Sequence, residues 1–202
     1  MTRAEFAARL KNACAAVTAA EAELTEIDSK FGDADHGLTM AKIAGAISEA
    51  VDAAEGGIQS MLDDAAMAVM TLNGGSAVPL WNTWLDGLQE EAPEGEEIDV
   101  AGLKAIFAKA LEELEDMSGA KVGDKTMMDA LIPASQAIAA YSGSDEQELF
   151  DAAAQAALQG AEASKQFVSK FGRAKSYGEQ TIGTPDAGAA SMAYFFQGLA
   201  RP

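Results

Sequence analysis

Residues 28–37 are Asp28-Ser29-Lys30-Phe31-Gly32-Asp33-Ala34-Asp35-His36-Gly37, and the rest of the chain is organised around this stretch. It contains three carboxylates and the only histidine of the chain, and two glycines interrupt it. Glycine is a poor helix former, so we expect a turn between two helices here. Carboxylate oxygens suit Mg2+, which proteins usually bind together with nucleotide phosphates. The stretch therefore indicates either a metal and nucleotide site or a plain Asp-Gly turn without a ligand.

A calcium-binding EF-hand loop is a poor match to the same residues. Such a loop needs Asp or Asn at alternate positions, Gly at the sixth and Glu at the twelfth. Counted from Asp33, the twelfth position is Ala44. Mg2+ is therefore the cation that this stretch favours.

Length and composition predict a single all-α domain over residues 1–202. A chain of 202 residues is long enough to bury one hydrophobic core. Alanine is abundant, prolines number 5, and no run of alternating β-branched or aromatic residues marks a strand.

Hydrophobic periodicity and capping signals divide the chain into eight expected helices. The first begins at a capping box of Thr2 and Glu5, and the seventh at a box of Ser144 and Gln147. Pro133 lies inside the sixth, where it predicts a kink or a local break. The expected helices are residues 2–28, 37–54, 58–72, 79–88, 99–117, 124–141, 144–171 and 185–199. Their mostly short connections predict antiparallel neighbours in a bundle or closed helical barrel.

The charge of the chain argues against partners that carry phosphate backbones. The formal net charge is −18, from 32 acidic and 14 basic residues, so nucleic acid and anionic membranes are not expected partners. A nucleotide can still bind where metal ions or helix N-termini reverse the field. The N-terminus lacks an apolar leader, and no stretch approaches the ~18 apolar residues of a membrane span. We therefore expect a cytoplasmic location and no membrane association.

Further glycine-containing turns carry residues that suit a nucleotide. Residues 73–76 place glycine amides before a helix start, where the amides and the helix dipole attract anions, although the chain has no Walker A loop. Residues 123–127 and 172–175 each place a cation beside a glycine. Residues 186–189 place an acid and small residues in the first turn of the last helix. Taken singly, residues 73–76 favour a plain turn, the two cations fit the usual exposed surface charges, and ordinary helix packing explains residues 186–189 as well.

Taken together, these stretches resemble the L subunit, or L domain, of dihydroxyacetone kinases. The signature of that family has the form D-x4-GDGDHG, which residues 28–37 match with Ala34 in place of a glycine. The later motifs follow in the order of the family: Gly-Gly-Ser before a helix, then the runs at residues 123–134 and 172–189. The resemblance spans nearly the whole chain.

The resemblance implies a barrel of eight antiparallel helices with ADP or ATP bound at one end. It implies that Asp28, Asp33 and Asp35 ligate two Mg2+ ions bridging the phosphates, and that these residues form the catalytic group with His36. The nucleotide-binding residues that it implies are His36, Gly37, Leu38, Thr39, Gly75, Ser76, Ala77, Gly119, Met127, Arg173, Asp186, Ala187 and Gly188. Residues 36, 39 and 75–77 are expected at the phosphates, and residues 119, 127, 173 and 186–188 around the nucleoside.

The chain departs from the family pattern at two turns. Where the family has Gly-Gly-Ser-Ser-Gly, this chain has Ala77 and Val78 after Ser76, so one hydroxyl and one flexible glycine beside the γ-phosphate are lost. Where the family has Asp-Pro-Gly, this chain has Ala187 between the acid and the glycine. These changes bear on nucleotide affinity, while the three carboxylates are intact.

The resemblance also implies one half of a two-component ketose kinase. In that family a separate K subunit binds the ketone as a covalent adduct on a histidine. His36 is the only histidine here and is assigned to the phosphate site, so a K-type partner is implied. The ketose can be dihydroxyacetone or a ketotetrose such as erythrulose.

Two questions stay open from the sequence. The phosphoryl group can come from exchangeable ATP, or from a phosphotransferase-system protein that rephosphorylates bound ADP; homodimerisation is also left open. The competing class is a non-catalytic adaptor or regulator that binds ADP and Mg2+, and the altered turn at residues 76–78 supports it. The complete set of three carboxylates weighs against it, because carboxylates repel one another without a metal.

Overall fold

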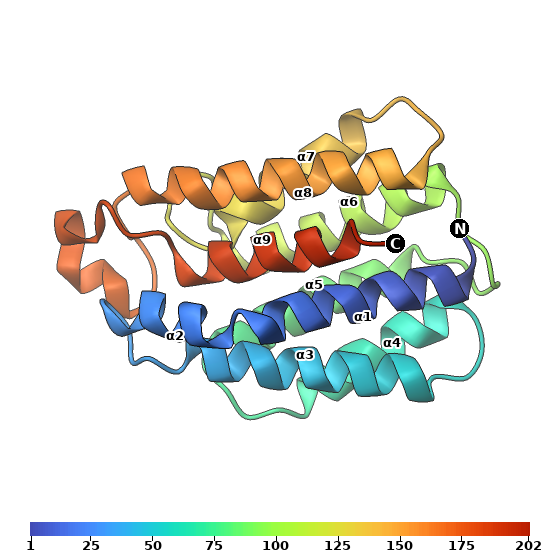
Figure 1. Cartoon of the computed structure of the whole chain (residues 1–202), viewed down its shortest axis with the longest axis horizontal. Helices are drawn as coiled ribbons and strands as arrows, with labels where there is room; N and C mark the ends of the chain where they lie inside the picture. The colour runs from blue at the N-terminus through green and yellow to red at the C-terminus, as the bar shows by residue number, and fades with distance from the viewer.

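The computed structural model describes residues 1–202, and nearly all of its regular structure is helical (Figure 1). The elements are α1 (Arg3–Ala19), α2 (Glu21–Ser29), α3 (His36–Ala53), α4 (Ile58–Met70), α5 (Ala77–Glu90), α6 (Val100–Ser118), α7 (Met128–Ala140), α8 (Glu146–Ala163), the 3-10 segments η1 (Ser164–Gln166) and η2 (Arg173–Thr181), and α9 (Ala187–Leu199). One isolated antiparallel bridge joins Thr2 to Glu97. None of the helices combines the length and the apolar character that a membrane crossing requires. The predicted all-α class is confirmed.

The α-helices close into a ring. α1 packs against α3 and α9, and each helix from α3 to α8 packs against the next one along the chain. α2 packs against the same two neighbours as α1, so these two helices together fill one position. The ring therefore has eight positions, and neighbouring positions run antiparallel (Figure 1).

The prediction of one helix over residues 2–28 is wrong, because the chain breaks at Ala20. Ala20 has φ −91° and ψ 4°, and its N–H bonds to the carbonyl of Val17, three residues back. This tighter bond closes a single 3-10-like turn between two α-helices. α1 begins at the predicted capping box of Thr2 and Glu5, and α2 carries Asp28 to its own C-terminal turn.

Two predicted helix caps are displaced toward the nearest aspartate. α8 is capped by Asp145 instead of Ser144, and its carboxylate accepts the N–H groups of two residues of the first turn. α9 is capped by Asp186 instead of Thr184, and its carboxylate accepts the N–H of Ala189 at 2.8 Å. A carboxylate satisfies first-turn donors and also interacts favourably with the helix dipole. α8 also ends earlier than predicted, and the chain from residue 164 onward leaves the barrel wall.

α7 starts later than predicted and runs without a break through Pro133. Residues 123–126 wrap around the buried carboxylate of Asp129, which accepts the N–H groups of Gly123 and Thr126. This arrangement delays the helix start to Met128. Pro133 has no N–H to offer the carbonyl of Asp129, and Gly160 of α8 packs so closely on that carbonyl oxygen that a Cβ would collide with it. The carbonyl that Pro133 leaves without an i+4 donor therefore lies at a close contact between α7 and α8.

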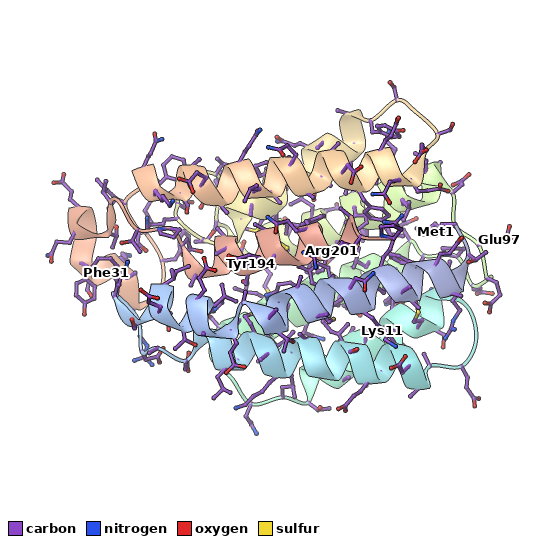
Figure 2. All side chains as sticks on the ribbon, viewed as in Figure 1. Met1, Lys11, Phe31, Glu97, Tyr194 and Arg201 are labelled. Carbon is purple, nitrogen blue, oxygen red and sulfur yellow. The ribbon has the colours of Figure 1, made fainter.

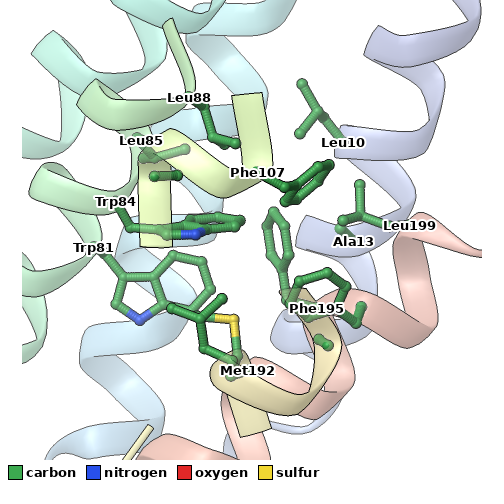
Figure 3. Close-up of a cluster of buried hydrophobic side chains, with 14 of the residues drawn as sticks. Leu10, Ala13, Trp81, Trp84, Leu85, Leu88, Phe107, Met192, Phe195 and Leu199 are labelled. Atoms are coloured by element: carbon green, nitrogen blue, oxygen red, sulfur yellow. The ribbon is translucent and has the colours of Figure 1, made fainter. Parts of the chain in front are cut away.

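Aromatic side chains fill the middle of the barrel (Figure 3). The ring of Phe195 lies edge-on to both tryptophans, with centroids 5.1 Å from Trp81 and 5.4 Å from Trp84. Phe107 completes the cluster at 6.1 Å from Trp84. Each such pair contributes ~0.5–1.5 kcal/mol beyond its area burial.

The antiparallel ring sorts the helix termini between its two ends. The N-termini of α3, α5, α7 and α9 lie at the end that carries Phe31, whereas Met1 and Glu97 lie at the other end (Figure 2). The partial positive charges of four helix dipoles therefore converge on the end that holds the acidic stretch.

Candidate functional site

The three aspartates of the acidic stretch come together in space. Asp28 lies on α2, whereas Asp33 and Asp35 lie in the turn that leads to α3. One oxygen from each carboxylate lies within 4.8 Å of the others. Oδ2 of Asp28 also accepts the N–H of Asp35 at 3.1 Å and that of His36 at 3.4 Å. The turn is thus folded back onto the helix that precedes it.

The backbone of this turn depends on two small residues. A Cβ on Gly32 would collide with the carboxylate of Asp28, so only glycine lets the turn approach that side chain. Ala34 has φ 62°, a left-handed conformation that glycine adopts without penalty and alanine does not. Ala34 occupies the position where the dihydroxyacetone kinase pattern has glycine, so the chain keeps the glycine-type turn at a cost in strain.

The electrostatics of the cluster favour a cation. Burial raises the pKa of Asp35, the carboxylates of Asp33 and Asp28 raise it further, and Arg173 opposes them. Arg173 is the one cationic side chain that contacts the cluster, with Nη2 at 2.6 Å from Oδ2 of Asp33. Three clustered carboxylates accessible to solvent form a donor set that fits a hard divalent cation such as Mg2+.

The carboxylate cluster opens on a cavity of about 530 Å3 at the same end of the barrel. This volume lies within the range of small-molecule sites. The predicted site residues that line it are Asp28, Asp33, Asp35, His36, Thr39, Gly75, Ser76, Ala77, Met127, Arg173, Asp186, Ala187 and Gly188. These residues come from four different turns of the chain. Trp81 also lines the cavity, so the aromatic core forms part of its wall.

The cavity wall is suited to an anion. The first residues of α3, α5, α7 and α9 all line it, and N-terminal amides together with the helix dipole favour negative charge. Gly75 has open space where a side chain would project, so its backbone is accessible to a ligand. Gly74, in contrast, lies against Val78 and Thr39. Of the two glycines, Gly74 is therefore needed for packing, whereas Gly75 leaves its backbone open to the cavity.

His36 links α3 to α9. Its Nε2 lies 3.2 Å from Oγ of Ser191, which itself donates to the carbonyl of Gly188 at 2.9 Å. The hydroxyl oxygen therefore accepts the Nε2 proton of the imidazole. Burial lowers the pKa of His36, so the ring is held in its neutral form. The sequence offered no signal for Ser191, which lies 155 residues from His36.

Three predicted nucleotide-binding residues do not line the cavity. Gly37 packs against α2, where a Cβ would collide with the carbonyl of Glu21. Leu38 is 50% exposed on the outside of α3. Gly119 ends α6 in a left-handed conformation, with φ 64°. Its neighbours on both sides, residues 118 and 120, do line the cavity.

Lys125 differs most from the sequence-based expectation. Its position beside a glycine turn fits an exposed charge, yet it is 4% exposed and lines the cavity. Nζ of Lys125 donates to the carbonyls of Ser164 and Thr184. Burial lowers the pKa of Lys125, whereas the nearby Asp186 and Asp129 raise it. A buried ammonium group is rare unless it is paired.

Asp186 and Asp129 are the two carboxyls next to this lysine. Burial raises the pKa of Asp186 to about 7, and the charge of Asp129 adds to the increase. Burial also raises the pKa of Asp129, although backbone N–H donors, Gly123 first among them, oppose it. Lys125, Asp129 and Asp186 therefore link the start of α7 to the start of α9 through charge as well as packing.

Comparison with known proteins yields one family and several relatives. Residues 30–201 match the DAK2 domain family. The chain is 37% identical over 196 residues to D-erythrulose kinase of Mycolicibacterium smegmatis, covering 94% of this chain and 34% of that protein. It is 30% identical over 177 residues to the ADP-binding subunit DhaL of PEP-dependent dihydroxyacetone kinase 1 of Listeria innocua, covering 87% and 84% of the two chains.

Among solved structures, the fold matches the crystal structure of the dihydroxyacetone kinase from C. freundii in complex with AMP-PNP and Mg2+. The TM-score is 0.72 at 24% sequence identity, and the match covers 98% of this chain and 33% of that one. The chain spans 32–34% of the length of the first erythrulose kinases that it matches, but most of the length of the DhaL subunit. From the match over residues 30–201 and these relatives, the chain belongs to the DAK2 domain family.

Proposed function

We propose that this chain binds ADP or ATP with Mg2+ and serves as the phosphoryl-donating component of a ketose kinase. The observation that carries the proposal is the position of the three carboxylates, within 4.8 Å of one another at the mouth of a cavity lined by four helix N-termini. Metal-binding carboxylates beside anion-binding amides are the two elements that a magnesium nucleotide requires.

Asp28, Asp33 and Asp35 would hold two Mg2+ ions, which neutralise phosphate charge when they are bound. The backbone N–H groups of Asp35 and His36 fix the Asp28 carboxylate toward the cluster. Phosphoryl transfer depends mostly on positioning and charge stabilisation, and this geometry supplies both. The proposal assigns the phosphates to the open backbone at Gly75 and to the first turns of α3 and α5.

The nucleoside is assigned to the far side of the same cavity. Met127, Ala187 and Gly188 supply small or flexible apolar surface there, and Ala187 and Gly188 lie in the first turn of α9. Gly188 lies close to the backbone of Met127, so that a Cβ at this position would be only 3.2 Å from the Met127 nitrogen. A side chain at residue 188 would narrow the cavity beside Met127. The absence of a side chain at Gly188 leaves a space there that suits the flat base of a nucleotide.

The ketose is assigned to a different polypeptide unit. His36, the only histidine, is half-buried and its Nε2 is occupied by Ser191, so no histidine is free to hold a carbonyl substrate. The matched erythrulose kinases are about three times as long as this chain, whereas the matched DhaL subunits are similar in length. Both observations support a K-type partner that binds dihydroxyacetone or a ketotetrose.

Coupled turnover tests this proposal. The purified chain is combined with a dihydroxyacetone kinase K subunit, Mg2+ and a panel of trioses and tetroses, with ATP as the donor. Ketose phosphate that forms only when both proteins are present confirms the kinase role and identifies the substrate. Tightly bound ADP without ATP-driven turnover indicates a phosphotransferase-system donor instead, which addition of that system's phosphorylated carrier proteins then tests.

The competing proposal is an adaptor that binds ADP and Mg2+ without catalysis. It is favoured by the turn before α5, where Ala77 lines the cavity and Val78 is buried in the core, so neither offers a hydroxyl to a γ-phosphate. ADP binding without turnover under either donor would support this role. Absence of any nucleotide binding would contradict both proposals.

A further inference from the structure

The segment of residues 164–184 forms a loop over the mouth of the cavity. It leaves the barrel wall at the end of α8 and returns at the start of α9. Its middle, residues 171–174, lines the cavity. Within that part Arg173 pairs with Asp33. Further along the loop, Tyr177 lies edge-on to Phe31 with ring centroids 5.2 Å apart. The position of this loop therefore decides the shape of the cavity mouth.

The two ends of the loop are joined by one buried ammonium group. Nζ of Lys125 donates to the carbonyl of Ser164 at 2.7 Å and to the carbonyl of Thr184 at 2.5 Å. These two carbonyls are the first and last of the loop, so Lys125 clamps its neck. A backbone bond from Gly183 N–H to the Lys165 carbonyl, at 2.7 Å, closes the neck on the same side.

The residue next to Lys125 holds the same loop at a second point, Lys170. The carboxylate of Asp124 pairs with Nζ of Lys170 at 2.6 Å. The backbone carbonyl of Asp124 also accepts the N–H of Lys170, at 3.1 Å. The connection between α6 and α7 thus anchors the loop at its neck and again at Lys170. The backbone of this connection is unusual at Lys125, where φ is 61°, an angle that non-glycine residues seldom adopt.

We infer that Lys125 is a positioning residue whose buried ammonium clamps the neck of the 164–184 loop and thereby sets Arg173 and Phe171 at the cavity mouth. The inference rests on the proposed function only for its consequence, which is tighter nucleotide binding. Without the clamp, the buried Ser164 carbonyl and the partly buried Thr184 carbonyl lose a charged donor, and the loop opens more often. The apparent affinity for a ligand falls in proportion to the population of the closed loop.

The experiment compares two lysine variants of the full chain. Lys125→Met removes the ammonium and keeps a side chain of similar length. Lys165→Met is the matched control, because Lys165 lies in the same neck but pairs with Glu162 on the outside. Hydrogen exchange by mass spectrometry reports opening of the loop without any nucleotide. Calorimetric titration with ADP and Mg2+ reports the affinity.

For Lys125→Met we expect exchange at residues 164–184 to accelerate at least ~10-fold while the helices of the barrel keep their protection. The dissociation constant for ADP should rise by a similar factor, and Lys165→Met should change either quantity less than twofold. Lys125→Arg, which keeps a charged donor, should restore part of both. Unchanged loop exchange in Lys125→Met would overturn the inference.

If Lys125→Met fails to fold, a second variant tests the role of the loop neck. Oγ of Ser164 accepts the N–H of Asp186 at 2.9 Å, so Ser164→Ala loosens the neck and leaves the ammonium in place. Faster loop exchange together with weaker ADP binding supports the positioning role of the neck. Faster exchange with unchanged ADP affinity overturns it. If the wild-type chain binds no nucleotide, the proposed function fails, whereas the exchange measurement still tests the clamp.

Discussion

Arg173 reaches across the cavity mouth to Asp33, with Nη2 at 2.6 Å from Oδ2, although the two residues lie 140 positions apart in the sequence. The guanidinium thereby occupies a carboxylate oxygen that the proposed Mg2+ site needs. A cation that enters the site must therefore compete with this exposed ion pair, which is weak enough to be displaced.

Arg173→Gln should tighten Mg2+ binding in the absence of nucleotide, by up to about fivefold, because a competing cation is removed. Calorimetric titration with Mg2+ measures this. Lys175→Gln is the control, since Lys175 is exposed on the same segment and carries the same charge. Equal effects of the two substitutions would show that only net charge matters and would contradict the competition.

Asp33→Asn should weaken Mg2+-dependent ADP binding by at least ~100-fold, because one charged ligand leaves a cluster that depends on carboxylate oxygens. Binding without Mg2+ should change little, which distinguishes loss of the metal site from loss of the fold. The control is Asp63→Asn, whose aspartate is exposed on α4 outside the cavity. Retained Mg2+-dependent binding in Asp33→Asn would remove Asp33 from the metal site.

Ala34→Gly should leave the free energy of unfolding unchanged or raise it by up to ~1 kcal/mol, because glycine relieves the strain of φ 62°. Urea unfolding provides the measurement. Ala15→Gly is the control, because Ala15 is exposed within α1 and its replacement should cost ~1 kcal/mol. Similar losses at both positions would mean that the left-handed turn carries no strain.

Gly160→Ala should lower the free energy of unfolding by about 1–3 kcal/mol, because its Cβ would collide with the carbonyl of Asp129 on α7. Gly45→Ala is the matched control, since Gly45 lies within α3 with open space around its Cβ position. There the better helix propensity of alanine should add ~1 kcal/mol. Opposite signs for the two substitutions confirm the close contact, and equal signs contradict it.

The raised pKa of Asp186 predicts a pH dependence of stability. The pKa rises from an ordinary 3.8 to about 7 in the folded chain, so the folded state binds the proton more tightly than the unfolded state. The corresponding stability is complete below the ordinary pKa and is lost as pH rises toward and through 7. Unfolding free energies measured between roughly pH 4 and pH 8, the window of that shift, test this dependence.

Asp186→Asn removes this titration and keeps an oxygen that can cap α9. The variant should therefore gain stability over the wild type as pH rises, by about 1 kcal/mol or more across that window. Asp129 and Lys125 face the same cluster and are present in both proteins, so the difference between the two pH profiles reports the titration of Asp186 together with its coupling to these two groups. Parallel pH profiles of the two proteins would contradict the assignment.

Most of the fold could be predicted from local patterns. The periodic apolar residues and the capping box at Thr2 predicted the helices and their short connections, and these connections favoured an antiparallel ring. The errors occurred at helix ends. The break at Ala20 has no strong local signal. The late start of α7 has none either, because it depends on the carboxylate of Asp129, which accepts the N–H of Gly123.

The candidate site also contains residues that could be predicted from the sequence and residues that could not. The three aspartates of residues 28–35 could be grouped from the sequence because a single short turn suffices to bring them together. Leu38 could not be excluded in advance, since the outward face of a first helical turn depends on where the neighbouring helices pack. Its 50% exposure is a property of the ring, not of the motif.

The sequence by itself determined an all-helical chain with an acidic turn that groups three carboxylates, because helix periodicity and the carboxylate spacing of residues 28–35 are local properties. Only the tertiary structure decided that Lys125 is a buried clamp, that Arg173 meets Asp33 and that His36 is held by Ser191. Each of these contacts joins segments separated by 39 to 155 residues. Their geometry arises when the ring closes and buries polar groups that must then find partners.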